Sequence, residues 1–178
     1  MMKKFRLPGI GLRNLKTALG VFVCILLYEL FNRPYVFFAC ISVIICLAPT
    51  MEVSFQLGKD RMMSTVVGGL LGIPFLYLKN MAISVVDLFA LEAIIICAGI
   101  VLVIYLLNLM DNKGAVTNAC IVFLSVLITL GEGTEQLSPF VYSLNRIIDS
   151  AVGIIVALAI NKYFFPFHEE QKSAKGNF

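Results

Sequence analysis

The sequence is poor in charged residues and lacks several residue types that soluble domains use. Only 14% of its 178 residues are Asp, Glu, Lys or Arg, tryptophan is absent, and there is a single histidine, His168. Soluble domains carry about 25% charged residues. The hydrophobic residues make up 60% of the chain, and the mean hydropathy is +0.93. These values exclude an ordinary soluble domain and predict a membrane protein, with the lipid bilayer as its main partner.

Motifs that support catalysis or metal binding are also missing. The five cysteines lie inside apolar runs without a C-x-x-C pair, which argues against a disulfide framework and a zinc site and predicts small buried side chains. No H-E-x-x-H, G-x-S-x-G or phosphate-binding glycine loop occurs, and His168 is expected to be solvated in a polar tail. The net charge of +3 is too small to indicate a nucleic-acid partner. We therefore expect no enzymatic activity, no metal and no cofactor.

The apolar runs predict an all-α, polytopic membrane fold with six transmembrane helices, since each span needs about 20 mostly apolar residues. Residues 50–60 are amphipathic and carry both signs of charge, so we expect an interfacial connector there. We predict one transmembrane domain over residues 15–165, with cytoplasmic segments at 1–14 and 166–178. The predicted spans are 15–31, 35–48, 61–78, 85–110, 115–130 and 139–165.

The basic residues predict the orientation of these spans. If the N-terminus is cytoplasmic, 11 of the 14 lysines and arginines fall on the cytoplasmic side and three on the other. The positive-inside rule then places both termini in the cytoplasm. Five tyrosines near the predicted span ends are expected to form an aromatic belt at the membrane interfaces: Tyr28, Tyr35, Tyr77, Tyr142 and Tyr163.

A weak internal repeat relates the two halves of the chain. Residues 61–68 align with residues 146–153 at an offset of 85, and the Arg, Val and Gly positions are identical. Both copies begin the third helix of a three-helix set, and three is odd, so the second set must be upside down in the membrane. We therefore predict two inverted three-helix repeats, near 15–79 and 85–165, a plan typical of secondary transporters.

Small residues recur at intervals of four in both copies. Residues four apart share one helix face, and small ones let helix backbones approach closely in lipid. We expect the third and sixth helices to cross at the centre of the fold. The stripes serve either as packing seams alone or as the border of a site. Their members are Ser64, Gly68 and Gly72 in the first copy and Gly153 and Ala157 in the second.

Several short motifs, taken in order, resemble a known family. They are Leu15-Lys16-Thr17-Ala18, then Ala48-Pro49-Thr50 with Ser54-Phe55, then Arg61, Thr65 and Gly68, and finally Arg146-Ile147-Ile148-Asp149-Ser150-x-x-Gly153 before Asn161. Over about residues 11–166 the chain resembles the aromatic acid exporter family of bacterial inner-membrane proteins, also called the fusaric acid resistance-like or FUSC family. Ser64 stands where that family often has glycine.

The resemblance implies a six-helix inner-membrane module that exports aromatic or other weak organic acids by proton coupling. Family members usually continue into a cytoplasmic domain or carry the module twice, whereas this sequence ends in a short polar tail. A homo-oligomer or a partner subunit is therefore expected.

Two arginines are the main candidates for binding an organic anion. Arg61 and Arg146 begin equivalent helices, and a planar guanidinium is well suited to a carboxylate. Two alternatives remain open: each arginine extends to a membrane interface, or it pairs with a carboxylate of the chain, Arg146 with Asp149 and Arg61 with Glu52 or Asp60. Three polar neighbours join them as candidate substrate-binding residues: Ser64, Thr65 and Asn145.

Acidic residues in apolar spans are candidates for proton coupling, because loss of hydration makes proton exchange near neutral pH feasible. Asp149 is the first choice, with Glu29 and Glu92 as further candidates, while Asp87 is expected to be a solvated helix start.

Three functions are compatible with these patterns. The leading one is an exporter that alternates access between its two repeats. The second is a non-transporting scaffold or partner subunit that packs through its glycine-rich helix faces. The third is an uncoupled pore.

Overall fold

The computed structural model describes residues 12–33, 35–85, 89–131 and 138–164. Within these ranges the chain forms six α-helices, a short 3-10 turn at Lys113–Ala115 and no strand, which confirms the all-helical prediction. Helices satisfy their backbone hydrogen bonds internally, as an apolar environment requires. Their bounds are α1 Leu12–Leu30, α2 Phe37–Cys46, α3 Met51–Val85, α4 Phe89–Leu109, α5 Val116–Gly131 and α6 Pro139–Tyr163.

Four of these helices are long and apolar enough to cross a membrane: α3, α4, α5 and α6. Helix α1 has 19 residues, but Arg13, Lys16 and Glu29 interrupt its apolar character. Helix α2 has 10 residues and is therefore about 15 Å long, half the thickness of the hydrocarbon core. By length and composition, the described chain thus holds four clear spans and two further helices.

Helix α3 differs from the sequence-based prediction of a connector at 50–60 followed by a separate helix. It is continuous from Met51 to Val85, because the charged segment winds as its first three turns. Two hydroxyl groups fix its start: Thr50 accepts from the Val53 N–H (3.4 Å), and Ser54 accepts from the Ala48 N–H (3.0 Å). A helix of 35 residues is about 52 Å long, so α3 must tilt or extend beyond the hydrocarbon core.

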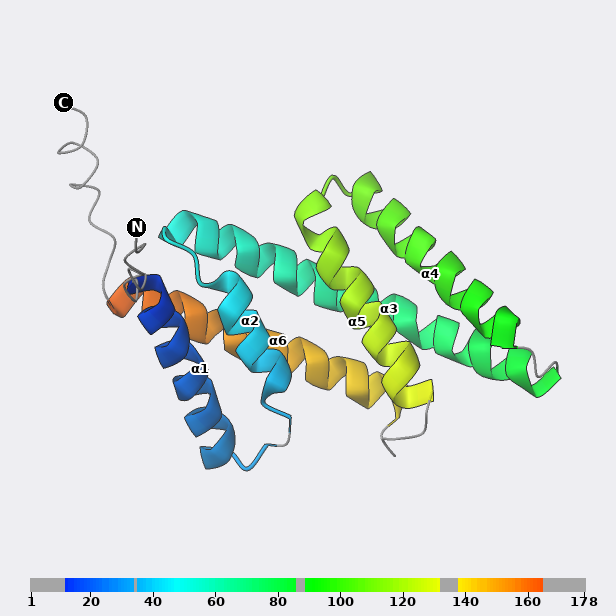
Figure 1. Cartoon of the computed structure of the whole chain (residues 1–178), viewed down its shortest axis with the longest axis horizontal. Helices are drawn as coiled ribbons and strands as arrows, with labels where there is room; N and C mark the ends of the chain where they lie inside the picture. The colour runs from blue at the N-terminus through cyan, green and yellow to red at the C-terminus, as the bar shows by residue number, and fades with distance from the viewer. Residues whose placement is uncertain (1–11, 34, 86–88, 132–137, 165–178) are drawn as a thin grey trace, which may run out of the picture.

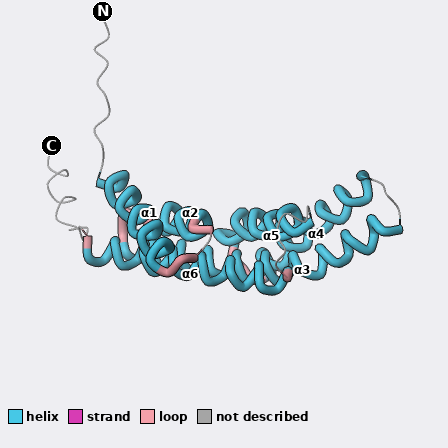
Figure 2. Tube along the Cα trace, turned by 90° about the horizontal axis from the view of Figure 1, so that it is seen from below, coloured by secondary structure: helices cyan, strands magenta, loops and turns pink. Residues whose placement is uncertain are grey.

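The two longest helices, α3 and α6, lie side by side and run in opposite directions (Figure 1). Figure 2 shows them forming one layer, with the other four helices on one side of it. Helix α6 packs mainly against α2 and α1 besides α3, whereas α3 packs mainly against α5 and α4 besides α6. Each long helix therefore covers the short helices from the other half of the chain.

Two apolar clusters stabilise the two ends of this arrangement. One joins α1, α2 and α6 around Cys24, Val43 and Ile160, and the other joins α4 and α5 to α3 around Phe123 and Leu127. Many large apolar side chains remain exposed on the outer faces, as expected of a surface covered by lipid. The prediction that all five cysteines are buried is confirmed for Cys24 and Cys46, whereas Cys40 and Cys120 are half-buried and the prediction is wrong for Cys97, which is exposed on α4.

Several sequence-based expectations lie outside the described residues: the segments 1–11 and 165–178, and with them His168, and also Asp87 and the acidic loop at 132–137.

Candidate functional site

The interface between α3 and α6 is polar at its centre. The hydroxyl oxygens of Thr65 and Ser150 lie 3.1 Å apart, within hydrogen-bond distance. Close apolar contacts flank this pair: a Cβ added at Gly58 would lie 2.9 Å from Ile154, and one added at Gly69 would lie 3.4 Å from the Cβ of Ser143. Along these contacts the residue numbers rise on α3, from Gly58 to Gly69, and fall on α6, from Ile154 to Ser143. The two helices therefore pack antiparallel along about three turns.

The glycine stripes face other helices than expected. A Cβ added at Gly68 would lie 2.5 Å from the Ala119 carbonyl oxygen on α5, and one added at Gly153 would collide with the Ala39 carbonyl oxygen on α2. Gly72 likewise faces Val126 on α5. Ala157 belongs to a small buried cluster of Cys46 and Ile154. The stripes therefore bring α3 close to α5 and α6 close to α2, rather than α3 close to α6.

Arg61 is buried, with 2% of its surface exposed, and its partners are neutral. Its Nε donates to the Ser42 hydroxyl (3.3 Å), and its Nη1 donates to the side-chain oxygen of Asn118 (3.2 Å). Within the described ranges no carboxylate lies within 4 Å of its guanidinium. Glu52 is exposed, and Asp60 accepts instead from Gln56 (3.2 Å). A buried charge without a counter-ion is costly, so a bound anion would stabilise this arrangement.

The two hydroxyl groups predicted to join Arg61 in binding are engaged by the backbone of α3. Ser64 and Thr65 both donate to the Arg61 carbonyl oxygen, at 2.7 and 2.8 Å. Both side chains are fully buried. Ser64 and Thr65 therefore lie one turn from Arg61 on α3. Thr65 also connects α3 to α6 through its contact with Ser150.

Arg146 is also buried, with 3% of its surface exposed, but its surroundings are aromatic and acidic. Its guanidinium lies 3.8 Å from the ring centre of Phe38 and 4.9 Å from that of Tyr142. Its Nη2 lies 3.2 Å from Oδ2 of Asp149, three residues along the same helix. These contacts combine an ion pair with cation–π stacking.

Asp149 is the centre of a network that joins α1 to α6. Its Oδ1 accepts from the Tyr28 hydroxyl (2.5 Å) and lies 3.9 Å from Nη1 of Arg33. Arg33 also donates through Nη2 to the side-chain oxygen of Asn145 (3.2 Å). We call Tyr28, Arg33, Asn145, Arg146 and Asp149 the Asp149 network.

The other two acidic candidates lie apart from both arginine sites. Glu92 forms an ion pair with Lys79 (2.6 Å), which is buried and also donates to the Leu127 carbonyl oxygen (3.4 Å). This group connects α3, α4 and α5. Glu29 is exposed on α1.

Sequence reasoning missed several members of these groups. Tyr28 and Tyr142 were expected in an aromatic belt, but both are buried, Tyr28 as a member of the Asp149 network and Tyr142 against Arg146, so that prediction is wrong for these two. A contact between residues 121 positions apart leaves no local signal. Asn118 could have been recognised from the sequence, because a polar amide in an apolar helix needs a hydrogen-bond partner.

Motif residues far apart in the sequence also converge at the start of α3. The buried Lys16 amine donates to the side-chain oxygen of Asn161 (3.3 Å), and the Asn161 amide donates to the Ser54 hydroxyl (2.9 Å). Ser54 in turn accepts from Ala48. Helices α1, α3 and α6 are thus tied together through polar residues of three separate motifs.

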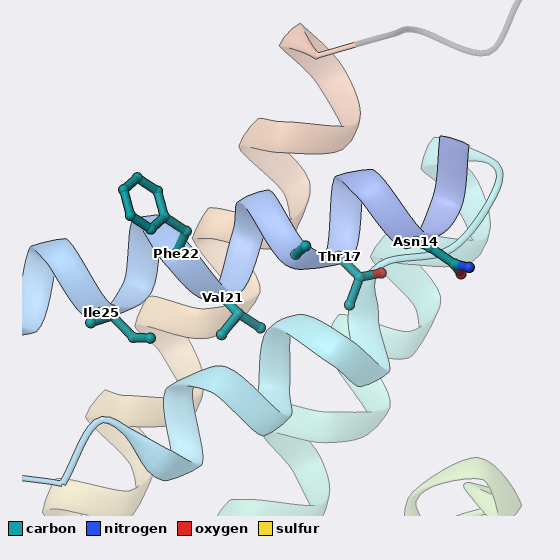
Figure 3. Close-up of a pocket in the computed structure, with 6 residues that line it drawn as sticks. Asn14, Thr17, Val21, Phe22 and Ile25 are labelled. Atoms are coloured by element: carbon teal, nitrogen blue, oxygen red, sulfur yellow. The ribbon is translucent and has the colours of Figure 1, made fainter. Parts of the chain in front are cut away.

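Two hollows on the described surface lie beside α1, and neither includes Arg61 or Arg146 in its lining. A groove of about 600 Å³ lies along α1, lined by Asn14, Thr17, Ala18, Val21, Phe22 and Ile25 (Figure 3). A smaller one of about 280 Å³ between α1 and α6 has only apolar and aromatic lining residues, among them Val23, Ile155 and Tyr163. These linings contain no charged side chain. The candidate anion site is therefore the buried polar region around Arg61 and the Asp149 network.

Apolar helices long enough to cross a membrane, with buried cations and acids between them, indicate a membrane protein whose buried charges are functional candidates. The chain belongs to the aromatic acid exporter family: the model of aromatic acid exporter family member 1 matches residues 9–164.

Relatives of this chain include a UPF0421 protein of Bacillus cereus and one of Bacillus thuringiensis, each 28% identical over 160 residues. The match covers 89% of this chain and 41% or 40% of the relative, so the chain spans about two fifths of the length of these proteins. No solved structure matches the chain significantly.

Proposed function

We propose that this chain is the membrane module of an exporter for aromatic or other weak organic acids, and that the substrate carboxylate binds at Arg61. One observation carries the proposal: Arg61 is 2% exposed and, among the described residues, its guanidinium has the side chains of Ser42 and Asn118 as hydrogen-bond partners and no carboxylate within 4 Å. A planar cation in a low-dielectric site binds a carboxylate strongly.

We further propose that the two halves are inverted repeats. Matched contacts around two glycines support this. Gly68 meets Ala119 and Val122, whereas Gly153 meets Ala39 and Ser42. The glycines differ by 85 positions (153 minus 68), and both neighbour pairs differ by 80 (119 minus 39 and 122 minus 42).

A second set of matched contacts involves α1 and α4. Gly20 faces Val43 and Ile160, and Gly99 faces Phe123 and Phe75. The glycines differ by 79 positions, Val43 and Phe123 by 80, and Phe75 and Ile160 by 85. Exchanging the halves therefore converts each of these contact sets into the other.

Six spans are compatible with the short α2 in this proposal. The non-helical residues Leu47 and Ala48 that follow α2 are buried, and irregular backbone is tolerated at membrane depth when protein surrounds it. α2 would then span together with its flanks.

We propose that the chain lies in a bacterial inner membrane with both termini on the cytoplasmic side. Among the cations that the structure describes, four are buried and so add no charge to a loop: Lys16 and Arg61 on the cytoplasmic side, Lys79 and Arg146 on the other. Removing two from each side changes 11 against 3 to 9 against 1. The positive-inside bias becomes stronger.

Proton coupling is placed at Asp149 in this mechanism. Protonation removes the charge that holds Arg146 and so releases the arginine, and rocking of one repeat against the other alternates access. A proton biases this equilibrium only if its affinity differs between the two states. Glu92 is held by Lys79, and Glu29 is exposed, so Asp149 is the best placed of the three acids.

The second candidate, a scaffold that binds a partner through glycine-rich faces, is less well supported. Gly68, Gly72 and Gly153 face α5 and α2 of the same chain. These faces are therefore filled within the chain, and a second copy or a partner subunit would have to use another surface.

Efflux of a panel of aromatic carboxylates from cells that express the chain tests the proposal. We expect Arg61→Gln, Arg146→Ala and Asp149→Asn each to slow efflux strongly. Lys59→Gln is the matched control, since it removes the same charge from an exposed position of α3. Wild-type efflux in the three test variants would remove these residues from the mechanism.

A further inference from the structure

The two arginines occupy equivalent positions, yet among the described residues only Arg146 has a carboxylate within ion-pair distance. Three residues after Arg146 stands Asp149, which lies 3.2 Å from its Nη2. Three residues after Arg61 stands Ser64, whose hydroxyl donates to the Arg61 carbonyl oxygen (2.7 Å). Asp149 and Ser64 are separated by the offset of 85 that relates the two copies.

The helices that face the two arginines, α5 at Arg61 and α2 at Arg146, also differ in polarity. Arg61 contacts the amide of Asn118 on α5, whereas Arg146 stacks on Phe38 of α2, the residue 80 positions earlier. Ser42 adds a hydroxyl group beside Arg61. The Ser42 hydroxyl itself donates to the Phe38 carbonyl oxygen (2.8 Å), so an anion at Arg61 would meet the Asn118 amide as its neighbouring donor. Arg146 is instead enclosed by rings and its own acid.

The pairing of Arg146 with Asp149 is incomplete. Nε of Arg146 and Oδ2 of Asp149 are both buried, and neither has a hydrogen-bond partner in the part of the chain that the structure describes. The contact to Nη2 is therefore an ion pair without well-directed hydrogen bonds. Tyr28 and Arg33 hold the other carboxylate oxygen from α1 and its C-terminal loop. A carboxylate that approaches freely would bind Nε and Nη2 together, as a bidentate pair.

We propose that each arginine is a site for one carboxylate, that Asp149 fills the Arg146 site from within the chain, and that an external monocarboxylate fills the Arg61 site on the side of Ser64. Asp149 thus imitates the substrate. Tyr28 and Arg33 are positioning residues that hold Asp149 at Arg146. This inference rests on the proposed function and deepens it: it assigns a second carboxylate site and a substrate with one negative charge.

Exchanging the two equivalent residues tests the proposal. Benzoate binding to the purified full chain is measured by titration calorimetry for wild type, Ser64→Asp and Asp149→Ser, with Lys59→Gln, at an exposed position of α3, as the control. We expect one benzoate per chain for wild type and Lys59→Gln. Ser64→Asp should weaken binding at least tenfold, because its new carboxylate fills the Arg61 site, and Asp149→Ser should bind two. Unchanged binding in Ser64→Asp, or one benzoate in Asp149→Ser, overturns the proposal.

A second measurement covers the case in which Asp149→Ser is poorly stable, since it leaves Arg146 buried without its partner. Formate is small enough to replace the missing carboxylate. We expect formate to raise the thermal midpoint of Asp149→Ser clearly more than that of wild type, and not to raise that of Ser64→Asp. Equal shifts in all three proteins overturn the proposal.

These measurements also separate this inference from the proposed function. Binding that follows the expected pattern without any efflux would contradict the exporter function and leave the two carboxylate sites standing. Efflux that depends on Arg61, together with unchanged binding stoichiometry in Asp149→Ser, would contradict only the inference.

Discussion

Thr65 and Ser150 lie 85 positions apart in the sequence, and their hydroxyl oxygens lie 3.1 Å apart between α3 and α6. The same offset relates the two copies of the arginine–glycine motif, so equivalent positions of the copies touch each other. Equivalent residues meet in this way at a two-fold axis. The pair therefore marks where the axis of the proposed inverted repeat would pass.

The hydrogen bond between these hydroxyls should be measurable as a coupling energy. In a double-mutant cycle of Thr65→Val and Ser150→Ala, we expect a coupling of about 1 kcal/mol in the free energy of unfolding. Unfolding in mixed micelles with increasing SDS supplies the four values. Strictly additive effects would contradict the contact.

Substitutions of the two motif glycines should be strongly destabilising. A Cβ at Gly68 or Gly153 meets a backbone carbonyl oxygen of α5 or α2, which cannot move as a side chain can. We expect Gly68→Ala and Gly153→Ala each to cost about 1–3 kcal/mol of stability. Gly69→Ala is the matched control, because its Cβ would lie at an ordinary 3.4 Å from Ser143. An equal loss of stability in all three variants would contradict the packing described above.

The Lys79–Glu92 pair should act in stability rather than in proton coupling. Glu92→Gln leaves the buried Lys79 amine without its acid, which we expect to cost about 3–5 kcal/mol. The double variant Lys79→Met, Glu92→Leu should regain most of this loss, because an apolar pair replaces the ion pair. Thermal unfolding and efflux are measured together. Loss of efflux in a stable double variant would instead place Glu92 in the transport mechanism.

Tyr28 should stabilise the charged form of Asp149. Its hydroxyl donates to the carboxylate at 2.5 Å, and hydrogen bonds to charged groups contribute about 1.5–3 kcal/mol. Tyr28→Phe should therefore lower the free energy of unfolding by about this amount, whereas Tyr77→Phe, at an exposed position, should leave it unchanged. Equal effects of the two substitutions would show that the Tyr28 hydroxyl contributes nothing specific.

Much of the fold could be predicted because it depends on local patterns. Apolar runs bounded by Asn32, Pro139 and the Asp111–Gly114 turn predict helices near their observed positions. The start of α3 could not be predicted in this way. The charges of residues 50–60 resembled an interfacial segment, whereas the contacts of Asn161 with Ser54 and of Ile154 with Gly58 show that α6 covers the first turns of α3.

The candidate site was predictable only in part. Arg61, Arg146 and Asp149 stand out as charges in apolar helices, which lipid tolerates only with a partner. Their partners Tyr28, Arg33 and Asn118 lie on α1, the loop after it and α5, at separations of 57 to 121 residues. No periodicity in the sequence records such contacts, so the difference between the two arginine sites requires the three-dimensional arrangement.

Equilibrium binding of benzoate to purified Arg61→Gln is the most direct test of an anion site at this buried arginine, with Lys59→Gln as the control of equal charge. We expect Arg61→Gln to raise the Kd at least tenfold, and by about 30-fold if 2 kcal/mol of pairing energy is lost, while Lys59→Gln binds as wild type does. The same Kd in Arg61→Gln and wild type, with both proteins folded, would show that the substrate carboxylate does not bind at Arg61.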